Sequence, residues 1–380
     1  MNVRLIRGFT WSTQGALAGV AAALAGCGQS VQVTSIGGKM YPEAPAVARV
    51  QFLTSLTGAA DARDGGGSSL GKLLLGAPSE PLTRLSKPYG MAVHDGRLYV
   101  CDVAEGDVFI FDFAADRCTA WNHPDVRFGK PVAIRFRHDG NAEVCDVGAG
   151  KIFLLSPGGR LISSVGLDTL QSADSTSGLP ERFKPVASVT GPDGATAVLN
   201  AAAHRIELID MASGRHLGAW SGPGSEAGRL FAPTAMTDAA DGIVVSDVMN
   251  RRLVRFDRGG RPAGVIGEPG DAPGYIAHPK GVATDDAGAL YVADSALQIV
   301  EMFDGSGDFL MSFGGPEETD GGLLSPAGIC LDRSCLPHFK KHIAPGFDAE
   351  YLIFVSNQMG PGRISVYAFG QGRPGAAPAG

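Results

Sequence analysis

A carboxylate or carboxamide recurs along the chain at one point of a similar sequence context, directly after a short apolar run. Oxygen atoms of this kind could hold a metal ion or a substrate. A catalytic site, however, normally brings different residue types to one point. Because Asp and Asn side chains also accept backbone N–H groups in tight turns, we expect a structural role for the whole series. Its members are Asp102, Asp146, Asn200, Asp247, Asp294 and Asn357.

The histidines offer little further chemistry. His338 and His342 have the spacing that would let them bind a metal from one helical face, although a solvated loop is the preferred interpretation of this region. His278 precedes Pro279 and could face a central channel. The sequence contains no H-E-x-x-H or C-x-x-C-H motif. The corresponding zinc and covalent haem sites are therefore not indicated.

Two cysteines near the C-terminus are close in sequence. Cys330 and Cys335 could form a disulfide at the base of an insertion that spans about 332–350. An exported protein can form such bonds. The alternative is that both thiols are small buried hydrophobic groups.

The N-terminus has the organisation of a secretory signal. Arg4 and Arg7 precede an uncharged apolar stretch, 15–26, which is too short to span a bilayer but typical of a signal core. The stretch ends in Leu-Ala-Gly before Cys27, which resembles the bacterial lipobox. The alternative is an ordinary cleaved signal that a cysteine follows by chance.

The lipobox resemblance implies that residues 1–26 are removed and that Cys27 is lipidated. Several acyl chains on one residue anchor a protein stably. Gly28, rather than Asp, then implies sorting to the outer membrane of a Gram-negative bacterium. We expect residues 27–47 to form a flexible tether and residues 370–380 a disordered tail, because both are poor in bulky residues. The net charge of −7 and the lack of basic runs argue against a nucleic-acid partner.

The Asp and Asn series belongs to a longer repeat. Each unit begins with a proline, continues with two short apolar strands separated by a turn, and reaches the Asp or Asn at the end of the second strand. A third strand follows in all six units and a fourth in most of them. The intervals between the prolines are 43 to 54 residues, and the prolines are Pro88, Pro131, Pro185, Pro233, Pro279 and Pro326. Four strands in about 45 residues is the period of a β-propeller.

The sequence therefore predicts an all-β fold: one six-bladed β-propeller over residues 48–369, with four antiparallel strands in each blade. The unit HPKGVATDDAGALYVADS, which starts at His278, resembles the NHL repeat most clearly. The sixth unit lacks a fourth strand at the C-terminus. Residues 48–58 look like an outer strand, so we expect them to complete the last blade and to close the ring.

These features favour a membrane-anchored binding or scaffolding propeller that is not an enzyme. We expect its long loops, 59–86, 167–183 and 332–350, to contact a protein or glycan partner of the envelope, because loops on a rigid frame carry function. Six-bladed propellers also include lactonases and lyases. The alternative function is therefore a metal-dependent enzyme of that kind, with a divalent cation in the central channel as its cofactor.

Overall fold

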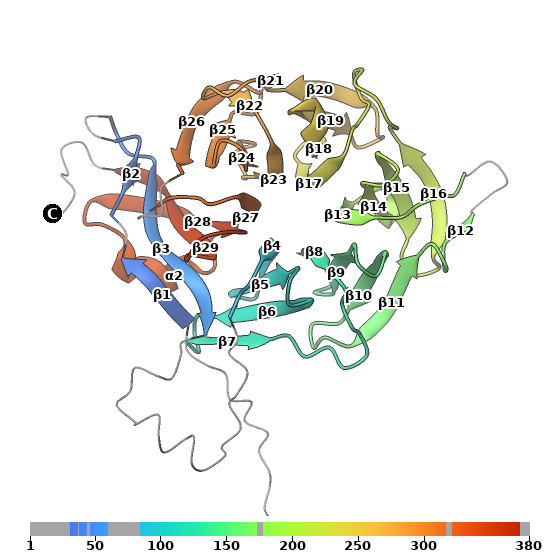
Figure 1. Ribbon diagram of the computed structural model, residues 1–380, viewed down its shortest axis with the longest axis horizontal. Coiled ribbons are helices and arrows are strands. Elements are labelled where there is room, and N and C mark those ends of the chain that lie inside the picture. Colours follow the sequence, from blue (N-terminus) through green and yellow to red (C-terminus); the bar gives the residue numbers. More distant parts are fainter. Residues whose placement is uncertain are drawn as a thin grey trace, which may run out of the picture.

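A computed structural model describes residues 31–36, 38–43, 46–59, 84–172, 178–316 and 321–372. Six antiparallel sheets stand around a central axis as the blades of a propeller, and the innermost strands of neighbouring blades contact one another around the whole ring (Figure 1). The predicted fold is confirmed. No helix within the described residues is long and apolar enough to cross a membrane.

Each blade contributes one strand to each of four concentric layers. The innermost strands are β4 (Pro88–His94), β8 (Pro131–Phe136), β13 (Pro185–Thr190), β17 (Pro233–Ala239), β23 (Pro279–Thr284) and β27 (Pro326–Asp332). The second strands are β5 (Arg97–Asp102), β9 (Ala142–Asp146), β14 (Thr196–Asn200), β18 (Gly242–Asp247), β24 (Leu290–Asp294) and β28 (Phe347–Asn357). The third strands are β6 (Asp107–Asp112), β10 (Lys151–Leu155), β15 (Arg205–Asp210), β19 (Arg252–Asp257), β25 (Ile299–Phe303) and β29 (Ile364–Gly372).

The outermost layer holds β7 (Arg117–Ala120), β11 (Leu161–Gly166), β16 (Arg215–Trp220), β20 (Pro262–Ile266), β26 (Phe309–Gly314) and β3 (Val50–Ala59). Short additional strands lie at the rim: β12 (Gln171–Ser172), β21 (Glu268–Pro269) and β22 (Tyr275–Ile276). The insertion between β27 and β28 contains the one-turn helix α2 (Leu336–Phe339) and a 3-10 turn, Lys340–His342. Phe339 is buried there, and its ring packs against Phe113.

Local sequence explains the shape of a blade. Every innermost strand starts at a proline, which suits a first strand position because no ladder donor is needed there. That proline lies opposite the Asp or Asn at the end of the second strand, as Pro88 lies opposite Asp102. The hairpin between β4 and β5 turns through Asp95 and Gly96, both with positive φ, which is the backbone that a two-residue hairpin turn requires.

The ring closes through its N-terminal strand. β3 pairs with β29 in antiparallel register and so becomes the fourth strand of blade six, as predicted. Phe52 of β3 is buried, and its ring meets that of Tyr367 at 5.4 Å between centroids. Strands from both ends of the chain thus share one sheet, which leaves no open edge at the joint.

Two expected boundaries are wrong. Within the predicted flexible tether 27–47, β1 (Val31–Ile36) and β2 (Met40–Tyr41) pair with β3 instead of remaining irregular. The predicted tail 370–380 starts too early, because β29 continues to Gly372 and Gly372 donates its N–H to Ala48 O at 2.9 Å. The signal 1–26, Cys27 and residues 373–380 lie outside the described residues.

We expect Phe52→Ala to destabilise the propeller by about 3–5 kcal/mol, because the change leaves a cavity in the buried joint between the two chain ends. The midpoint of chemical unfolding at equilibrium measures the effect. Phe309→Ala is the matched control: Phe309 lies on the outer strand β26 and is 39% exposed. If both variants lost the same amount of stability, the joint between the two chain ends would not have the stabilising role described here.

Candidate binding site in the central channel

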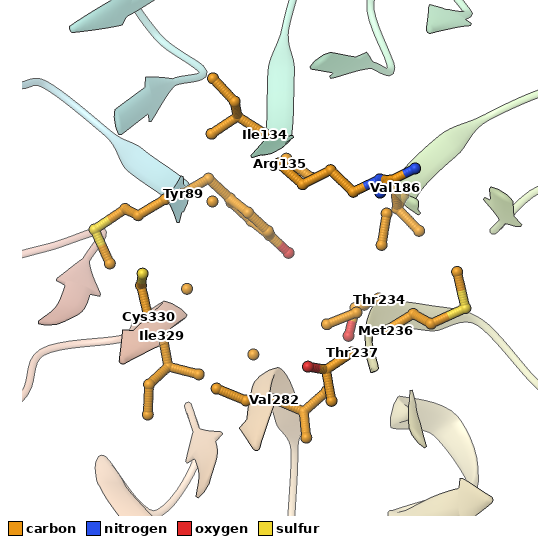
Figure 2. Close-up of a pocket in the computed structure, with 18 of the residues that line it drawn as sticks. Tyr89, Ile134, Arg135, Val186, Thr234, Met236, Thr237, Val282, Ile329 and Cys330 are labelled. Carbon is orange, nitrogen blue, oxygen red and sulfur yellow. The ribbon is translucent and has the colours of Figure 1, made fainter. Parts of the chain in front are cut away.

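The innermost strands surround a channel of about 390 Å³, a size that suits a small ligand or the end of a peptide. Figure 2 looks into it, with side chains from several innermost strands around the open centre. The channel has two ends. The proline face is the end at which the innermost strands begin, and the hairpin face is the end at which they turn into the second strands.

Large apolar side chains of the innermost strands pack between the blades and not into the channel. They belong to five different blades, are 6–8% exposed and lie in the hydrophobic cores, as Ile134 and Met236 do in Figure 2: Met91, Ile134, Met236, Val282 and Ile329. The neighbouring positions are glycine or alanine because the innermost strands approach each other closely. A Cβ on Gly90, for example, would lie 2.4 Å from Val132 O. The innermost strands therefore form a narrow frame around the channel.

The proline face carries hydrogen-bond donors. The residue after each starting proline lines the channel, and three of these six residues are polar: Tyr89, Thr234 and Lys280. The Thr234 hydroxyl is used by the frame, since it donates to Lys280 O at 3.0 Å. Lys280 donates to Gln358 Oε1 at 3.2 Å. Burial lowers the pKa of Lys280, and the neighbouring ammonium of Lys87 lowers it further.

Tyr89 extends across the channel, and its hydroxyl points toward the open centre (Figure 2). Burial raises the pKa of this phenol to about 12, so the hydroxyl stays protonated near neutral pH and can donate a hydrogen bond.

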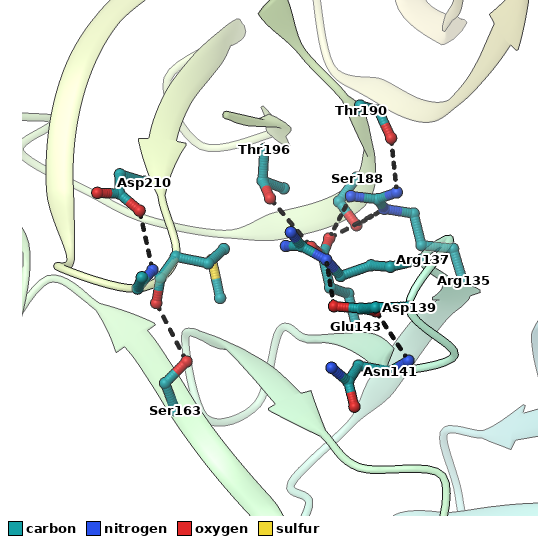
Figure 3. A network of polar contacts seen from close by, with 12 residues as sticks. Arg135, Arg137, Asp139, Asn141, Glu143, Ser163, Ser188, Thr190, Thr196 and Asp210 are labelled. Carbon is teal, nitrogen blue, oxygen red and sulfur yellow. Dashed lines mark hydrogen bonds and ion pairs between the residues drawn. The ribbon is translucent and has the colours of Figure 1, made fainter. Parts of the chain in front are cut away.

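Arg135 lines the channel near the hairpin face, but its charge is engaged. Arg135 and Arg137 both bind the buried carboxylate of Glu143, with Nη-to-Oε distances of 2.8 and 3.0 Å (Figure 3). Thr196 also donates to Glu143, and Arg135 reaches Thr190 in the next blade. This network joins blades two and three. Arg137 also pairs with Asp139 at 3.7 Å, so the two arginines are matched by two carboxylates.

The donor set of the channel does not fit a divalent cation. Asp238 is the one carboxylate among the described lining residues, and it pairs with Arg258 at 3.1 Å. Calcium and magnesium require several oxygen ligands. Across the described ranges, no three His, Cys, Asp or Glu side chains gather as a metal-binding group.

The Asp and Asn series does not face the channel. Asp102 is buried, and it accepts N–H groups from Ser86 and Lys87 before the innermost strand and from Ala104 and Glu105 after the second strand, at 2.7–3.1 Å. Asp146 and Asp294 bind backbone in the same way.

The other three members also use side-chain partners. Asp247 accepts a backbone bond from Phe231 and pairs with Arg252 at 3.0 Å. Asn200 and Asn357 accept a backbone N–H with the amide oxygen and donate from the amide nitrogen. We therefore interpret the series as structural residues that hold the start of each innermost strand to the end of the second strand.

The histidines that the sequence singled out lie apart from the channel lining. His338 is in α2, and His342 is in the 3-10 turn that follows. The turn is held against β3, because Gln51 donates to His342 O at 3.0 Å, so the expected solvated loop is packed on the blade. His278 contacts Ser295 through its ring, at 2.8 Å from Nδ1 to the hydroxyl oxygen.

The possible disulfide between Cys330 and Cys335 is not formed, and both residues carry free thiols. Cys335 is buried beside the insertion, and its N–H binds Asp332 at 2.6 Å. Cys330 lines the channel at the hairpin face. Burial raises the pKa of the Cys330 thiol to about 12, so neither a bridge nor a reactive thiolate is favoured there.

Two buried glutamates occupy the same place in different blades, seven residues after the Asp or Asn. In blade three, burial favours the neutral form of Glu207, but hydrogen bonds from His216, Arg205 and Asn200 outweigh it and lower its pKa. In blade five, Glu301 has one backbone partner, Gly274 N, and its Oε2 has no partner. Burial, with repulsion from Asp294, raises the pKa of Glu301 to about 8.

We expect Glu301→Gln to stabilise the protein progressively as the pH rises. The unfolded carboxyl ionises above its ordinary value of 4.5, while the folded one holds its proton to about pH 8. The wild type therefore loses stability across this window, at about 1.4 kcal/mol per pH unit, and the Gln variant does not. Chemical unfolding at pH 5 and pH 9 measures the difference.

Glu207→Gln is the matched comparison for that experiment. Because the folded protein lowers the pKa of Glu207, its ionised carboxyl stabilises the fold at pH values above the ordinary pKa of a glutamate. This stabilisation is lost on acidification. We therefore expect this variant to be less stable than wild type at neutral pH, with the deficit shrinking toward acid. If both substitutions changed the free energy of unfolding in the same direction at neutral pH, the two carboxyls would not be held in opposite charge states.

The structure is similar to several solved propellers. It aligns with a gluconolactonase from Xanthomonas campestris at 12% identity and a TM-score of 0.53, covering 90% of this chain and 100% of the other. A Bacteroides thetaiotaomicron protein of unknown function aligns at 11% identity and 0.52, covering 90% and 76%. A streptogramin B lyase aligns at 16% and 0.50, covering 75% and 94%. No family model and no curated protein matches the sequence. At these identities the similarity establishes the propeller fold.

Proposed function

We propose that this protein is an exported, lipid-anchored binding propeller of the NHL type that engages a partner on its proline face without catalysing a reaction. The observation that carries this proposal is the set of large apolar side chains exposed on that face. Phe231, Met249 and Met359 are 44%, 58% and 64% exposed. Exposed apolar groups that gather on one surface are typical of interaction sites.

The same face carries positive charge. Lys87, Lys130 and Lys184 are exposed and stand directly before the starting prolines of blades one, two and three. Phe231 and Met249 belong to blade four, and Met359 to blade six. A partner that covers this face would meet cations on one side of the channel and apolar anchors on the other. Met and aromatic residues are enriched in protein interfaces, so a protein partner is favoured over a glycan.

The anchor would hold the propeller close to the lipid surface. Cys27 is the proposed lipidation site, and β1 begins at Val31. Four residue steps span at most about 14 Å, so the edge of blade six cannot move far from the acyl chains. We propose the outer membrane of a Gram-negative bacterium as the location, on the basis of Gly28. In this arrangement the blade edge lies near the lipid and both faces of the ring are open to partners.

The alternative, a lactonase-like or lyase-like metal enzyme, would need a cation on the propeller axis. One carboxylate that is already paired with an arginine does not supply such a site, as described above. No residue of the channel favours this alternative over binding.

A photo-crosslinking experiment in cells tests the binding face. We expect p-benzoylphenylalanine at Met249 to give a discrete adduct with an envelope protein. The same residue at Leu310, which is 51% exposed on the outer strand β26, is the control for exposure and should give none. Protease digestion of the adduct would identify a protein. Equal adducts at both positions, or none at Met249, would argue against the proline face.

Anchoring is tested by labelling with radioactive palmitate. Wild type should be labelled, and Cys27→Ser should be unlabelled and should keep its signal as a larger precursor. Cys330→Ser removes a different thiol and should leave labelling unchanged. Labelling of the Cys27→Ser variant would refute the lipobox interpretation.

A further inference from the structure

We propose that the part of the partner that docks on the proline face is an acidic protein segment, whose Asp and Glu side chains pair with four lysines around the mouth of the channel. The lysines are Lys87, Lys130, Lys184 and Lys280. This inference rests on the proposed binding function and specifies the chemistry of the partner. It places the partner's carboxylates over blades one to three and at the channel mouth, with its apolar side chains over blade four.

Three of the lysines occupy one position of the repeat, directly before the starting proline, in blades that are consecutive around the ring (Figure 1). Lys87, Lys130 and Lys184 each donate the backbone N–H to the Asp or Asn of their own blade, at 2.8–3.0 Å. The carbonyl oxygen of each accepts the N–H of the residue after that Asp or Asn, at 3.0–3.1 Å. Their backbone is therefore fixed on the proline face, while their side chains are exposed.

Lys280 adds a fourth cation at the mouth, directly after the starting proline of blade five. It lines the channel, is partly buried, and donates to a neutral amide of blade six, Gln358. Burial and the nearby ammonium of Lys87 both lower the pKa of Lys280, so cations of blades five and one share this side of the mouth. A partly buried cation is costly unless an anion pairs with it. The Tyr89 hydroxyl, directed toward the open centre (Figure 2), supplies a further donor.

Within the described part of the chain, none of the four ammonium groups has an ion-pair partner. Asp102 and Asp146 lie in the same blades as two of them but are fully buried and accept backbone N–H groups. Glu105, which is exposed in the turn after β5, accepts the hydroxyl of Ser86 instead of pairing with Lys87. The lysine charges are therefore available on the surface, which is the arrangement that complements an acidic partner.

The distribution of these charges favours carboxylates along a protein segment over a phosphate group. The cations are lysines that stand on separate blades, whereas a phosphate is more typically held by an arginine fork or by several converging cations. Phe231 and Met249 are exposed on the same face, and such side chains are enriched in protein interfaces. The whole chain has a net charge of −7, so most of its surface would repel a polyanion. Binding of an acidic segment therefore requires a local basic surface of this kind.

Fluorescence anisotropy on the mature protein in a nonionic detergent tests the inference with two rhodamine-labelled peptides, octaglutamate and its neutral isostere octaglutamine. We expect octaglutamate to bind at least tenfold more tightly at 50 mM NaCl. It should lose most of this advantage at 300 mM NaCl, because salt screens exposed charges. Equal affinities for the two peptides, or no binding of octaglutamate by folded wild type, would overturn the inference.

Lysine variants locate the site. The triple variant Lys87→Gln, Lys130→Gln, Lys184→Gln removes three charges from the proline face and should weaken octaglutamate binding at least tenfold. Lys280→Met, made alone, keeps the side-chain length and should weaken binding several-fold. Neither change should affect octaglutamine. Unchanged thermal unfolding midpoints would show that the variants fold, and unchanged octaglutamate affinity in a folded triple variant would refute the assignment.

A second triple variant controls for net charge. Arg160 lies in the turn before β11, and Lys340 and Lys341 lie in the insertion, so all three are exposed toward the hairpin face. Replacing these three residues with Gln removes the same number of charges and should leave the octaglutamate affinity unchanged. Equal losses in the two triple variants would mean that net charge, and not the channel mouth, determines binding.

An anionic lipid is the competing source of negative charge. Unlabelled octaglutamate and the soluble short-chain lipid dihexanoyl-phosphatidylglycerol are compared as competitors of labelled octaglutamate, at equal total negative charge. We expect octaglutamate to displace the label at the lower concentration. Stronger displacement by the lipid would assign the lysines to a lipid surface and would overturn the acidic protein segment.

Photo-crosslinking in cells separates this inference from the proposed function. The adduct formed through p-benzoylphenylalanine at Met249 should be lost in the proline-face triple variant and kept in the hairpin-face triple variant. Mass spectrometry should place the crosslink in a segment rich in Asp and Glu. An adduct that persists in the proline-face variant, or a crosslinked segment without acidic residues, would overturn the inference and leave docking on this face intact. Absence of the adduct in wild type would contradict the proposed function itself.

Discussion

The buried carboxylate or carboxamide at the end of each second strand fixes the geometry on which the rest of this propeller depends. In blade one, a single side chain, Asp102, holds the N–H groups of Ser86 and Lys87 on one side and those of Ala104 and Glu105 on the other. It ties the entry of the innermost strand to the turn that leaves the second strand. Hydrogen bonds to a charged group contribute about 1.5–3 kcal/mol each. Asp146 and Asp294 repeat this arrangement, and the other three members share the bond to the entry of the innermost strand.

This repeated constraint also determines where the blades can differ. The position after the starting proline borders the channel and differs from blade to blade, whereas the following position is restricted to glycine or alanine by the neighbouring strand. The residues at the variable position are Tyr89, Val132, Val186, Thr234, Lys280 and Ala327. Chemical asymmetry around the axis arises at these positions, so a binding site can change while the fold remains constant.

The sequence pattern predicted most of the fold because its signals are local and repeated. In five of the six units, the starting proline, the turn and the Asp or Asn all lie within about twenty residues, and in the sixth the insertion separates Pro326 from Asn357. The closing strand β3 was predictable because the sixth unit lacked an outer strand. β1 was missed, although the segment VQVTSI alternates as a strand does, because the glycines and prolines that follow it suggested an irregular tether. It pairs with the edge of β3 that lies opposite β29.

The candidate site was beyond the reach of the same pattern. Tyr89 and Lys280 come from different blades, and their common level in the channel follows from the register of the whole ring. Equivalent positions also do not imply equivalent chemistry. Glu207 and Glu301 occupy one place in the repeat, yet Glu207 has three side-chain partners that favour its charge and Glu301 has none. The repeat determines where a side chain lies, and its neighbours from other strands and loops determine its protonation state. Positions in a propeller repeat therefore have to be interpreted blade by blade before they are assigned a chemical role.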